Sequence, residues 1–435
     1  MTHRILKIFV FFILCPLSLA SPANQDSEHI VTEEPELVEE RVSGNRREST
    51  LFGSRDSISV QLETDEAIKS PSGRLGALDG ALSGIQSWKR GLLEDYGLQL
   101  GMDLATLSQW ASESIDGTDN AWGAVARLYG RWAFHNRAAD NTGFIGFKVE
   151  NRSALGGEIP PKNLRREIGY LGYTDIVFSD DGNLITELSY QQRLGDNDQA
   201  AIVVGRFDPN NYMDVLGCCS PWTTFSNLSH LLNLSISLPD ASWGVGAGSW
   251  LGESEQWYVS GSISDANGTL RSGLDWFTGG AEFFKQAEIG WSPSRERRLY
   301  TKTSFTVWHV DEREDAGLPS SHGVAFSANK TWKDTWMGFF KAGVSSGEAV
   351  LYDEFALVGF GRVFHSNTDR IGLAMSYGKP PDSSLDAEKT MEVFYKFQLA
   401  KSLQLTTSYQ HIMDPALNPD ESSIGILGIR LRFIL

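Results

Sequence analysis

The end of the chain repeats with a period of two residues, which indicates an extended strand with two unlike faces. Large apolar side chains occupy every second position of the last nine residues: Leu427, Ile429, Leu431, Phe433 and Leu435. The positions between them hold Gly428, Arg430, Arg432 and Ile434. Soluble domains usually end in frayed polar residues, so a final residue on the apolar face is unusual. The pattern favours a strand in the wall of a closed barrel, apolar outside and wet inside.

The same period recurs between clusters of turn-forming residues along most of the chain. The segments that we expect to be strands are 96–105, 122–134, 144–150, 168–178, 184–192, 200–207, 243–250, 256–264, 281–291, 299–310, 323–330, 336–344, 355–364, 371–378, 391–399 and 403–409, followed by the terminal one. The sequence therefore predicts an all-β protein, a transmembrane antiparallel β-barrel. Alternation alone leaves a soluble β-sandwich open as the other solution.

The first 20 residues have the organisation of an export signal. Arg4 and Lys7 precede an apolar run from Ile8 to Leu19, and Ser18-Leu19-Ala20 fits a small-residue cleavage site. The run is short for a membrane-spanning helix, and no later segment is long enough either. We therefore expect residues 1–20 to be a signal peptide and the rest of the chain to be exported.

Residues 21–85 differ in composition from residues 86–435. Between Ser21 and Glu66 there are 12 acidic residues and 4 arginines, with few aromatic ones. Such a segment buries little apolar surface, so we expect a partly disordered periplasmic arm. A short helix or an interaction segment within it stays open. Residues 86–435 then form the barrel domain.

The balance of charges and cysteines excludes some classes of protein. The formal net charge of −17 becomes −19 without Arg4 and Lys7, so we expect no nucleic-acid partner. The exported chain keeps only Cys218 and Cys219. Adjacent cysteines can close only a strained ring, so we exclude a structural disulfide framework and expect two loop cysteines.

Several stretches resemble the carbohydrate-selective outer-membrane porins of Gram-negative bacteria. The most specific is 392–430, with EVFYKFQL at 392–399, LQL at 403–405, YQHIMDPALNP at 409–419 and GIR at 428–430. Residues 85–100, 187–192, 204–208 and 257–268 also resemble the family. The resemblance implies a barrel of 16 strands in the outer membrane. The segment 86–435 would then give each strand and its connection about 22 residues, which suits such strands.

The resemblance also implies a passive function. Small sugars would diffuse through a narrowed pore, with no cofactor and no energy coupling. The partners that it implies are small carbohydrates, outer-membrane lipid and the barrel-assembly machinery. Whether the barrel is a monomer or a trimer stays open.

Strand parity identifies the side chains that we expect to face the pore. A charge on the lipid face costs about 2–4 kcal/mol near the membrane midplane, so charges that alternate with large apolar residues belong inside. A sugar pore needs such ionisable and amide groups to replace the hydrogen bonds of water to hydroxyls. The pore-lining candidates are Arg127, Arg131, Lys148, Glu150, Glu187, Gln191, Arg206, Asp208, Arg430 and Arg432.

Other functions remain as alternatives to the sugar pore. A general or anion-preferring porin would use the same inward arginines to select charge. A barrel enzyme acting on lipid or glycan would need a nucleophile, and residues 343–347 fit G-x-S-x-G. That motif requires a strand–turn–helix context, whereas here it ends an alternating strand. We therefore expect no enzyme activity. A soluble, exported glycan-binding sandwich is the third alternative.

Overall fold

The computed structural model describes residues 52–67, 69–73, 75–137, 140–156, 159–237, 239–277, 280–364 and 368–435. The expected signal peptide and residues 21–51 of the acidic arm lie outside this part of the chain. Among the described residues, no helix combines the length and the apolar character needed to cross a membrane.

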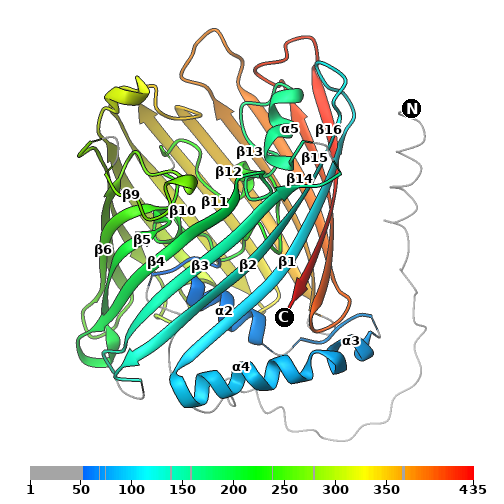
Figure 1. Ribbon diagram of the computed structural model, residues 1–435. Coiled ribbons are helices and arrows are strands. Elements are labelled where there is room, and N and C mark those ends of the chain that lie inside the picture. The colour runs from blue at the N-terminus through cyan, green and yellow to red at the C-terminus, as the bar shows by residue number, and fades with distance from the viewer. Residues whose placement is uncertain are drawn as a thin grey trace, which may run out of the picture. The chain divides into compact units, whose positions relative to one another are not determined.

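The strands of the described chain form one closed antiparallel barrel, in which β1 pairs with β16 (Figure 1). The sixteen strands are β1 (Leu98–Ala111), β2 (Asn120–His135), β3 (Gly143–Ala154), β4 (Gly182–Leu194), β5 (Ala200–Phe207), β6 (Ser242–Leu251), β7 (Trp257–Asp265), β8 (Phe283–Trp291), β9 (Thr301–Val310), β10 (Ser321–Trp332), β11 (Trp336–Ser346), β12 (Glu354–Phe364), β13 (Asp369–Lys379), β14 (Glu388–Gln398), β15 (Leu403–Met413) and β16 (Ser423–Ile434). This confirms the predicted 16-stranded barrel, and the soluble sandwich is excluded.

Side chains alternate between the two faces of the wall as the sequence predicts. On β2, Leu128 and Trp132 are exposed on the outside, whereas Arg127 and Arg131 are buried. On β16, Ile429 and Leu431 are exposed and the two arginines between and beyond them are buried. Since the period of a strand is two, each strand presents an apolar outer face and a polar inner face.

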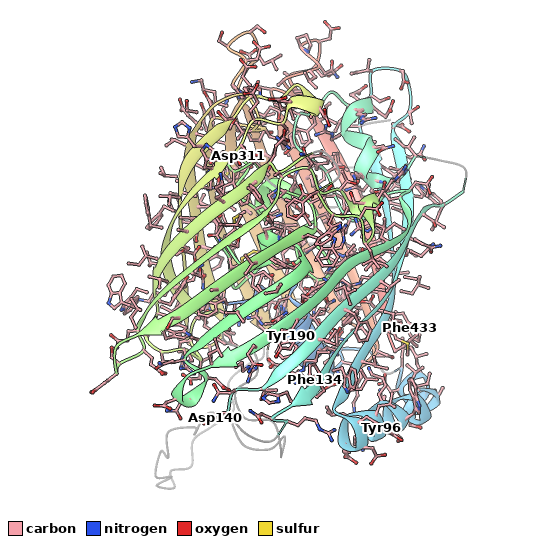
Figure 2. The ribbon with its side chains drawn as sticks, turned by 60° about the vertical axis from the view of Figure 1, so that its left-hand side comes forward. Tyr96, Phe134, Asp140, Tyr190, Asp311 and Phe433 are labelled. Carbon is pink, nitrogen blue, oxygen red and sulfur yellow. A yellow bond between two sulfur atoms is a disulfide. The ribbon has the colours of Figure 1, made fainter. Side chains whose placement is uncertain are left out.

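The two ends of the barrel differ. Short connections such as 252–256 and 333–335 lie at the end where β1 begins and β16 ends, which we call the short-turn end. Long connections, 155–181 and 208–241, lie at the other end. Exposed aromatic residues flank both: Phe134 lies at the short-turn end near Asp140 (Figure 2), and Trp110 and Trp122 lie at the far end, where β1 ends and β2 begins. Two aromatic belts of this kind mark the edges of a lipid-facing band.

The core of the molecule lies inside the barrel. Residues 208–241, which we call the lumen loop, fold inward and are almost entirely buried; they include η2 (Pro209–Asn211) and η3 (Leu228–His230). Phe225 of this loop packs on the inner wall, with its ring centroid 4.8 Å from that of Phe394 and 5.9 Å from that of Phe339. The loop therefore fills space that an empty barrel would leave to water.

The expected strand at 168–178 is wrong. This segment comes after α5 (Pro161–Glu167) and forms turns between β3 and β4. Ile168 and Tyr170 pack in one apolar cluster, and Leu171 and Tyr173 pack against another, formed with the lumen loop. Its alternating apolar residues are buried on two sides of the segment. In the sequence, this pattern looks the same as that of a strand in a sheet.

Three helices precede the barrel, where the sequence predicts the arm and the first strand: α2 (Ile58–Glu66), α3 (Gly76–Ala81) and α4 (Ser83–Tyr96). The expected strand at 96–105 therefore begins later, at Leu98. Gly97 separates α4 from β1 with a left-handed φ of +71°. A Cβ there would lie 2.5 Å from the Ala133 carbonyl oxygen, so this helix end requires glycine. The remaining short helices are η1 (Asp196–Asp198), η4 (Leu270–Ser272) and η5 (Glu314–Ala316).

Candidate functional site

Helix α2 lies inside the barrel and packs on two sides of the lumen (Figure 1). Ile58 and Leu62 contact Tyr129 of β2. Val60 packs with Val215 of the lumen loop and Leu299 of the β8–β9 turn. The short acidic sequence of α2 becomes helical here because its apolar residues are buried on both sides, which composition alone does not reveal.

The last turn of α2 joins a buried charged cluster on the barrel wall. Asp103 of β1 accepts hydrogen bonds from Arg127 Nε at 2.8 Å and from Arg432 Nε at 2.6 Å. Arg432 Nη2 also donates to Asp65 of α2 at 2.8 Å, and the Tyr129 hydroxyl donates to the same carboxylate. We call these five residues the Asp103 cluster. Two carboxylates balance two guanidinium groups, which buried charges require.

Arg127 connects three parts of the molecule. Besides Asp103, it donates to the side-chain oxygen of Gln61 on α2. Its guanidinium lies 3.5 Å from the ring centroid of Trp222 in the lumen loop. This cation–π stacking uses the flat face of the guanidinium and leaves its edge for hydrogen bonds. A predicted pore-lining residue therefore holds the wall, α2 and the loop together.

Lys148, Glu150 and Glu187 lie on the wall beside the start of α2. Lys148 pairs in register with Glu187, and its Nζ lies 3.4 Å from the Asp56 carbonyl oxygen. Glu150 is opposite Arg127 in register and accepts from Arg152 Nε at 2.7 Å. All three predicted residues are buried. They extend the Asp103 cluster into a ladder of opposite charges across β2, β3 and β4.

Arg131 and Gln191 contact other polar groups of the lumen. Arg131 Nε donates to Gln99 at 3.1 Å, and Gln99 in turn donates to Glu66 at the end of α2 at 2.7 Å. Gln191 donates to the Tyr212 hydroxyl of the lumen loop at 3.1 Å. Gln191 thus contacts the lumen loop directly, and Arg131 is linked to α2 through Gln99.

Arg206 and Asp208 have local partners and stand apart from the cluster. Arg206 donates to the carbonyl oxygens of Ile185 and Thr269, both at 2.7 Å. Asp208 accepts from the backbone and side chain of Asn210, each at 2.9 Å, and so caps the short helix η2. Burial raises the pKa of the Asp208 carboxyl to about 6. These two residues shape the start of the lumen loop.

Arg430 secures the lumen loop to the last strand. Its guanidinium donates to the carbonyl oxygens of Pro221 and Thr224 and, at 3.2 Å, to the Ser226 hydroxyl. Near this contact, Cys218 and Cys219 form a disulfide with each other. They are loop cysteines as expected, but they are bonded inside the lumen.

Sequence reasoning missed several residues that fix the loop. Both oxygens of Glu392 accept from backbone N–H groups, of Ser226 and Asn227, at 2.9 Å each. Lys341 pairs with Asp214 at 2.6 Å. Glu392 occupies a position of β14 whose side chain faces the lumen, so the alternation of the strand could have identified it as a pore-lining candidate. Nothing in the sequence indicates which loop residue each of these charges meets.

A cavity remains between α2 and the wall of β3 to β8, with an empty volume of about 750 Å³ including its opening to solvent. Its lining combines aromatic rings with amide and hydroxyl groups and with one arginine, whose charge is paired with Asp198: Phe52, Phe144, Phe207, Tyr212, Gln191, Gln192, Ser260, Ser262, Gln286 and Arg193. Aromatic faces can stack on the C–H surface of a sugar, while amides and hydroxyls exchange hydrogen bonds with its hydroxyls. The arrangement suits a neutral, hydroxyl-rich solute.

Comparison with known proteins points in the same direction. A family model described as carbohydrate-selective porin, OprB family, matches residues 162–435. A high-pH structure of Pseudomonas putida OprB aligns with 85% of this chain and 100% of its own, at 12% identity and a TM-score of 0.63. A triple mutant of Rhodopseudomonas blastica porin covers 78% of this chain and 100% of its own, at 10% identity and a TM-score of 0.48. No curated protein matches the chain. The first of these structures supports the fold, and the family match spans more than half of the chain.

Proposed function

The chain belongs to the OprB family of carbohydrate-selective porins, and we propose that sugars cross it along the part of the lumen that α2 leaves free. It is an outer-membrane channel for passive diffusion of carbohydrates. The observation that supports this route is the cavity beside β3 to β8, where aromatic rings alternate with neutral amides and hydroxyls. A diffusing sugar can exchange its hydrogen bonds to water for hydrogen bonds to these groups without being bound so tightly that it stays in the pore.

The ten pore-lining residues divide into three roles. Arg127, Arg131, Arg430 and Arg432 hold α2 and the lumen loop and thereby set the width of the path. Lys148, Glu187 and Gln191 offer hydrogen bonds to passing hydroxyls. Glu150, Arg206 and Asp208 shape the wall through their local partners. The contacts described above support the roles of the four arginines, and Gln191 lines the cavity itself.

α2 acts as a plug that narrows the sugar path. Its charged end is held by two arginines of the wall, and its apolar residues are buried on both sides. A segment that is held by ion pairs and a few apolar contacts can leave the lumen at a lower free-energy cost than a strand can leave the barrel. Release of α2 would enlarge the pore without unfolding the wall.

The rest of the chain serves delivery and placement. Residues 1–20 direct export, and the acidic segment 21–85 belongs to the periplasmic side of the barrel, with α2 as its part inside the lumen. The barrel-assembly machinery inserts the barrel with its short-turn end toward the periplasm, as in other outer-membrane barrels. Each barrel carries a complete lumen, so one copy suffices for transport whether or not copies associate.

Single-channel conductance in a planar bilayer tests the role of the inward arginines. Arg127→Ala and Arg131→Ala should each weaken the block by neutral sugars and shift ion preference toward cations, because each removes a positive charge from the lumen. Arg297→Ala is the matched control, since Arg297 is exposed in the β8–β9 turn and forms a pair with Asp334.

The outcomes separate the alternatives. Unchanged sugar block and ion preference in both variants would remove Arg127 and Arg131 from the constriction. A channel that discriminates among ions but ignores a panel of neutral sugars would favour the anion-preferring pore instead of the proposed sugar path.

A further inference from the structure

Helix α4 carries an apolar stripe that the barrel covers only in part. The stripe recurs at helical spacing along one face and consists of Ile85, Trp88, Leu92 and Tyr96. No residue of α4 is fully buried: Ile85 and Leu92 are half-buried, whereas Trp88 is 54% exposed and Tyr96 is 64% exposed. The opposite face is polar and holds Ser83, Ser87, Arg90 and Glu94. A helix of this kind has an apolar face that still lacks a partner.

Contacts at both ends fix where α4 lies on the barrel. The backbone oxygen of Tyr96 accepts from the indole of Trp132 at 3.2 Å, and Lys89 donates to the Leu435 oxygen at 2.9 Å. On the other side, the Asp79 carboxylate of α3 accepts from the backbone of Ser402 in the β14–β15 turn at 3.2 Å. The helix therefore runs along the short-turn end, across the start of β1 and the end of β16 (Figure 1).

This position coincides with the aromatic belt at the short-turn end. Trp132 is exposed on the outer face of β2, and its ring centroid lies 5.6 Å from that of Phe134. Figure 2 shows Tyr96 at the same end as Phe134 and the turn residue Asp140. Because aromatic belts lie at the level of lipid headgroups, the contacts of Tyr96 and Trp132 set one end of α4 at that level.

We propose that α4 is an interfacial helix, with its apolar stripe inserted among the phospholipids of the periplasmic leaflet. Lipid is the occupant because the stripe continues the lipid-facing surface of the barrel through the bonded pair Tyr96 and Trp132. Arg90 and Glu94 stay in water, as the polar face of an interfacial helix does. The anchored helix holds the segment that leads to α2 at the mouth of the pore, a role separate from sugar diffusion.

Collision accessibility of nitroxide labels in phospholipid vesicles tests this placement. Trp88→Cys and Leu92→Cys report on the apolar stripe, and Ser87→Cys and Glu94→Cys are the matched controls on the polar face of the same helix. The native Cys218 and Cys219 are bonded to each other, and unsubstituted protein taken through the labelling gives the background. Retained heat-modifiable migration on gels shows that each variant has folded.

If the stripe contacts lipid, labels on it collide more with oxygen, which dissolves in lipid, than with a nickel chelate, which stays in water. The ratio of the two collision rates should then be several-fold higher at positions 88 and 92 than at 87 and 94. Equal ratios at all four positions would overturn the proposal, since α4 would then lie in water. Labels at 88 and 92 that are shielded from both reagents and broaden one another between molecules would also overturn it, in favour of a second copy. Neither result depends on whether sugars pass through the pore.

Discussion

Asp65 connects α2 to two residues of the barrel wall at once. Its carboxylate accepts from Arg432 and from the Tyr129 hydroxyl, and it is buried with both partners. Arg432 keeps Asp103 as a second partner, so it still has an ion pair on the wall when Asp65 is changed, although one carboxylate then faces two guanidinium groups. Asp65 is therefore the residue at which the plug can be loosened and the barrel left intact.

Asp65→Asn should weaken the docking of α2 by about 1–3 kcal/mol, because the buried charge-assisted hydrogen bond to Arg432 is lost. We expect single-channel currents that are larger than those of the unsubstituted protein, or that switch to a larger level more often. Glu94→Gln, at an exposed carboxylate of α4, is the control and should leave the currents unchanged. Identical currents for Asp65→Asn would contradict the role of α2 as a plug.

Asp175 makes the turns after α5 sensitive to pH. Its carboxyl accepts from the backbone N–H groups of Val177 and Phe178 at 2.8 and 2.9 Å, and burial raises its pKa to about 7. An unfolded aspartate has a pKa of about 3.9. Between these values the folded segment holds a proton that the unfolded one has released, so its stability decreases as pH rises from about 4 to about 7.

Hydrogen exchange at Val177 and Phe178 measures this effect. After correction for intrinsic rates, protection should increase as pH falls from 7.5 to 5, by at most about tenfold per pH unit for one proton. Asp175→Asn has no titrating group and should lose this slope. The same slope in both proteins would show that another group is responsible.

At the scale of elements, the lumen loop is held by charges on the inner wall. Glu392 of β14 accepts from two loop N–H groups and from His230 Nδ1 at 3.2 Å, and Lys341 of β11 pairs with Asp214. These bonds satisfy backbone groups that would otherwise be buried without partners. The loop therefore depends on specific wall residues as well as on its apolar contacts.

Glu392→Gln should lower the temperature at which the folded gel band disappears, because an amide offers one acceptor oxygen where two N–H groups now bind. The expected loss is about 1–3 kcal/mol. Lys389→Gln, on the same strand, removes an exposed pair with Asp414 and should cost at most about 1 kcal/mol. Equal losses in the two variants would argue against a specific role for Glu392.

At the scale of the whole molecule, stability in the membrane depends on the outer face of the wall. Leu431 lies on that face of β16 and is 42% exposed, and Leu417 of the β15–β16 loop is 50% exposed. The two leucines are thus similar in exposure and differ in what surrounds them. Lipid surrounds the first, and water surrounds the second.

Leu431→Lys should reduce the yield of barrel refolded into vesicles, because a lysine on the lipid face costs about 2–4 kcal/mol near the midplane. Leu417→Lys should refold like the unsubstituted protein. Similar yields for the two variants would mean that β16 does not face lipid at this position.

The sequence predicted the wall far better than its contents. The strand expected at 122–134 is β2, and the one expected at 403–409 lies within β15, because alternation is a local property of each strand. The strand-borne charged candidates are buried on the inner face for the same reason. The segment at 168–178 was mistaken for a strand, and a helix such as α2 was left open without a place in the lumen, because both are buried by distant parts of the chain.

Period two along the strands determined which residues share a face and which charges point inward, since a side chain's face depends only on its position in its own strand. The closed barrel of 16 strands was predicted only together with the family resemblance. Only the tertiary structure decided what those charges do. Arg432 meets Asp65 across 367 positions of sequence, and Arg430 meets the lumen loop across more than 200. Such pairs form because the closed barrel brings distant segments into one small, partly dehydrated space. No local pattern records which partner each charge will find there.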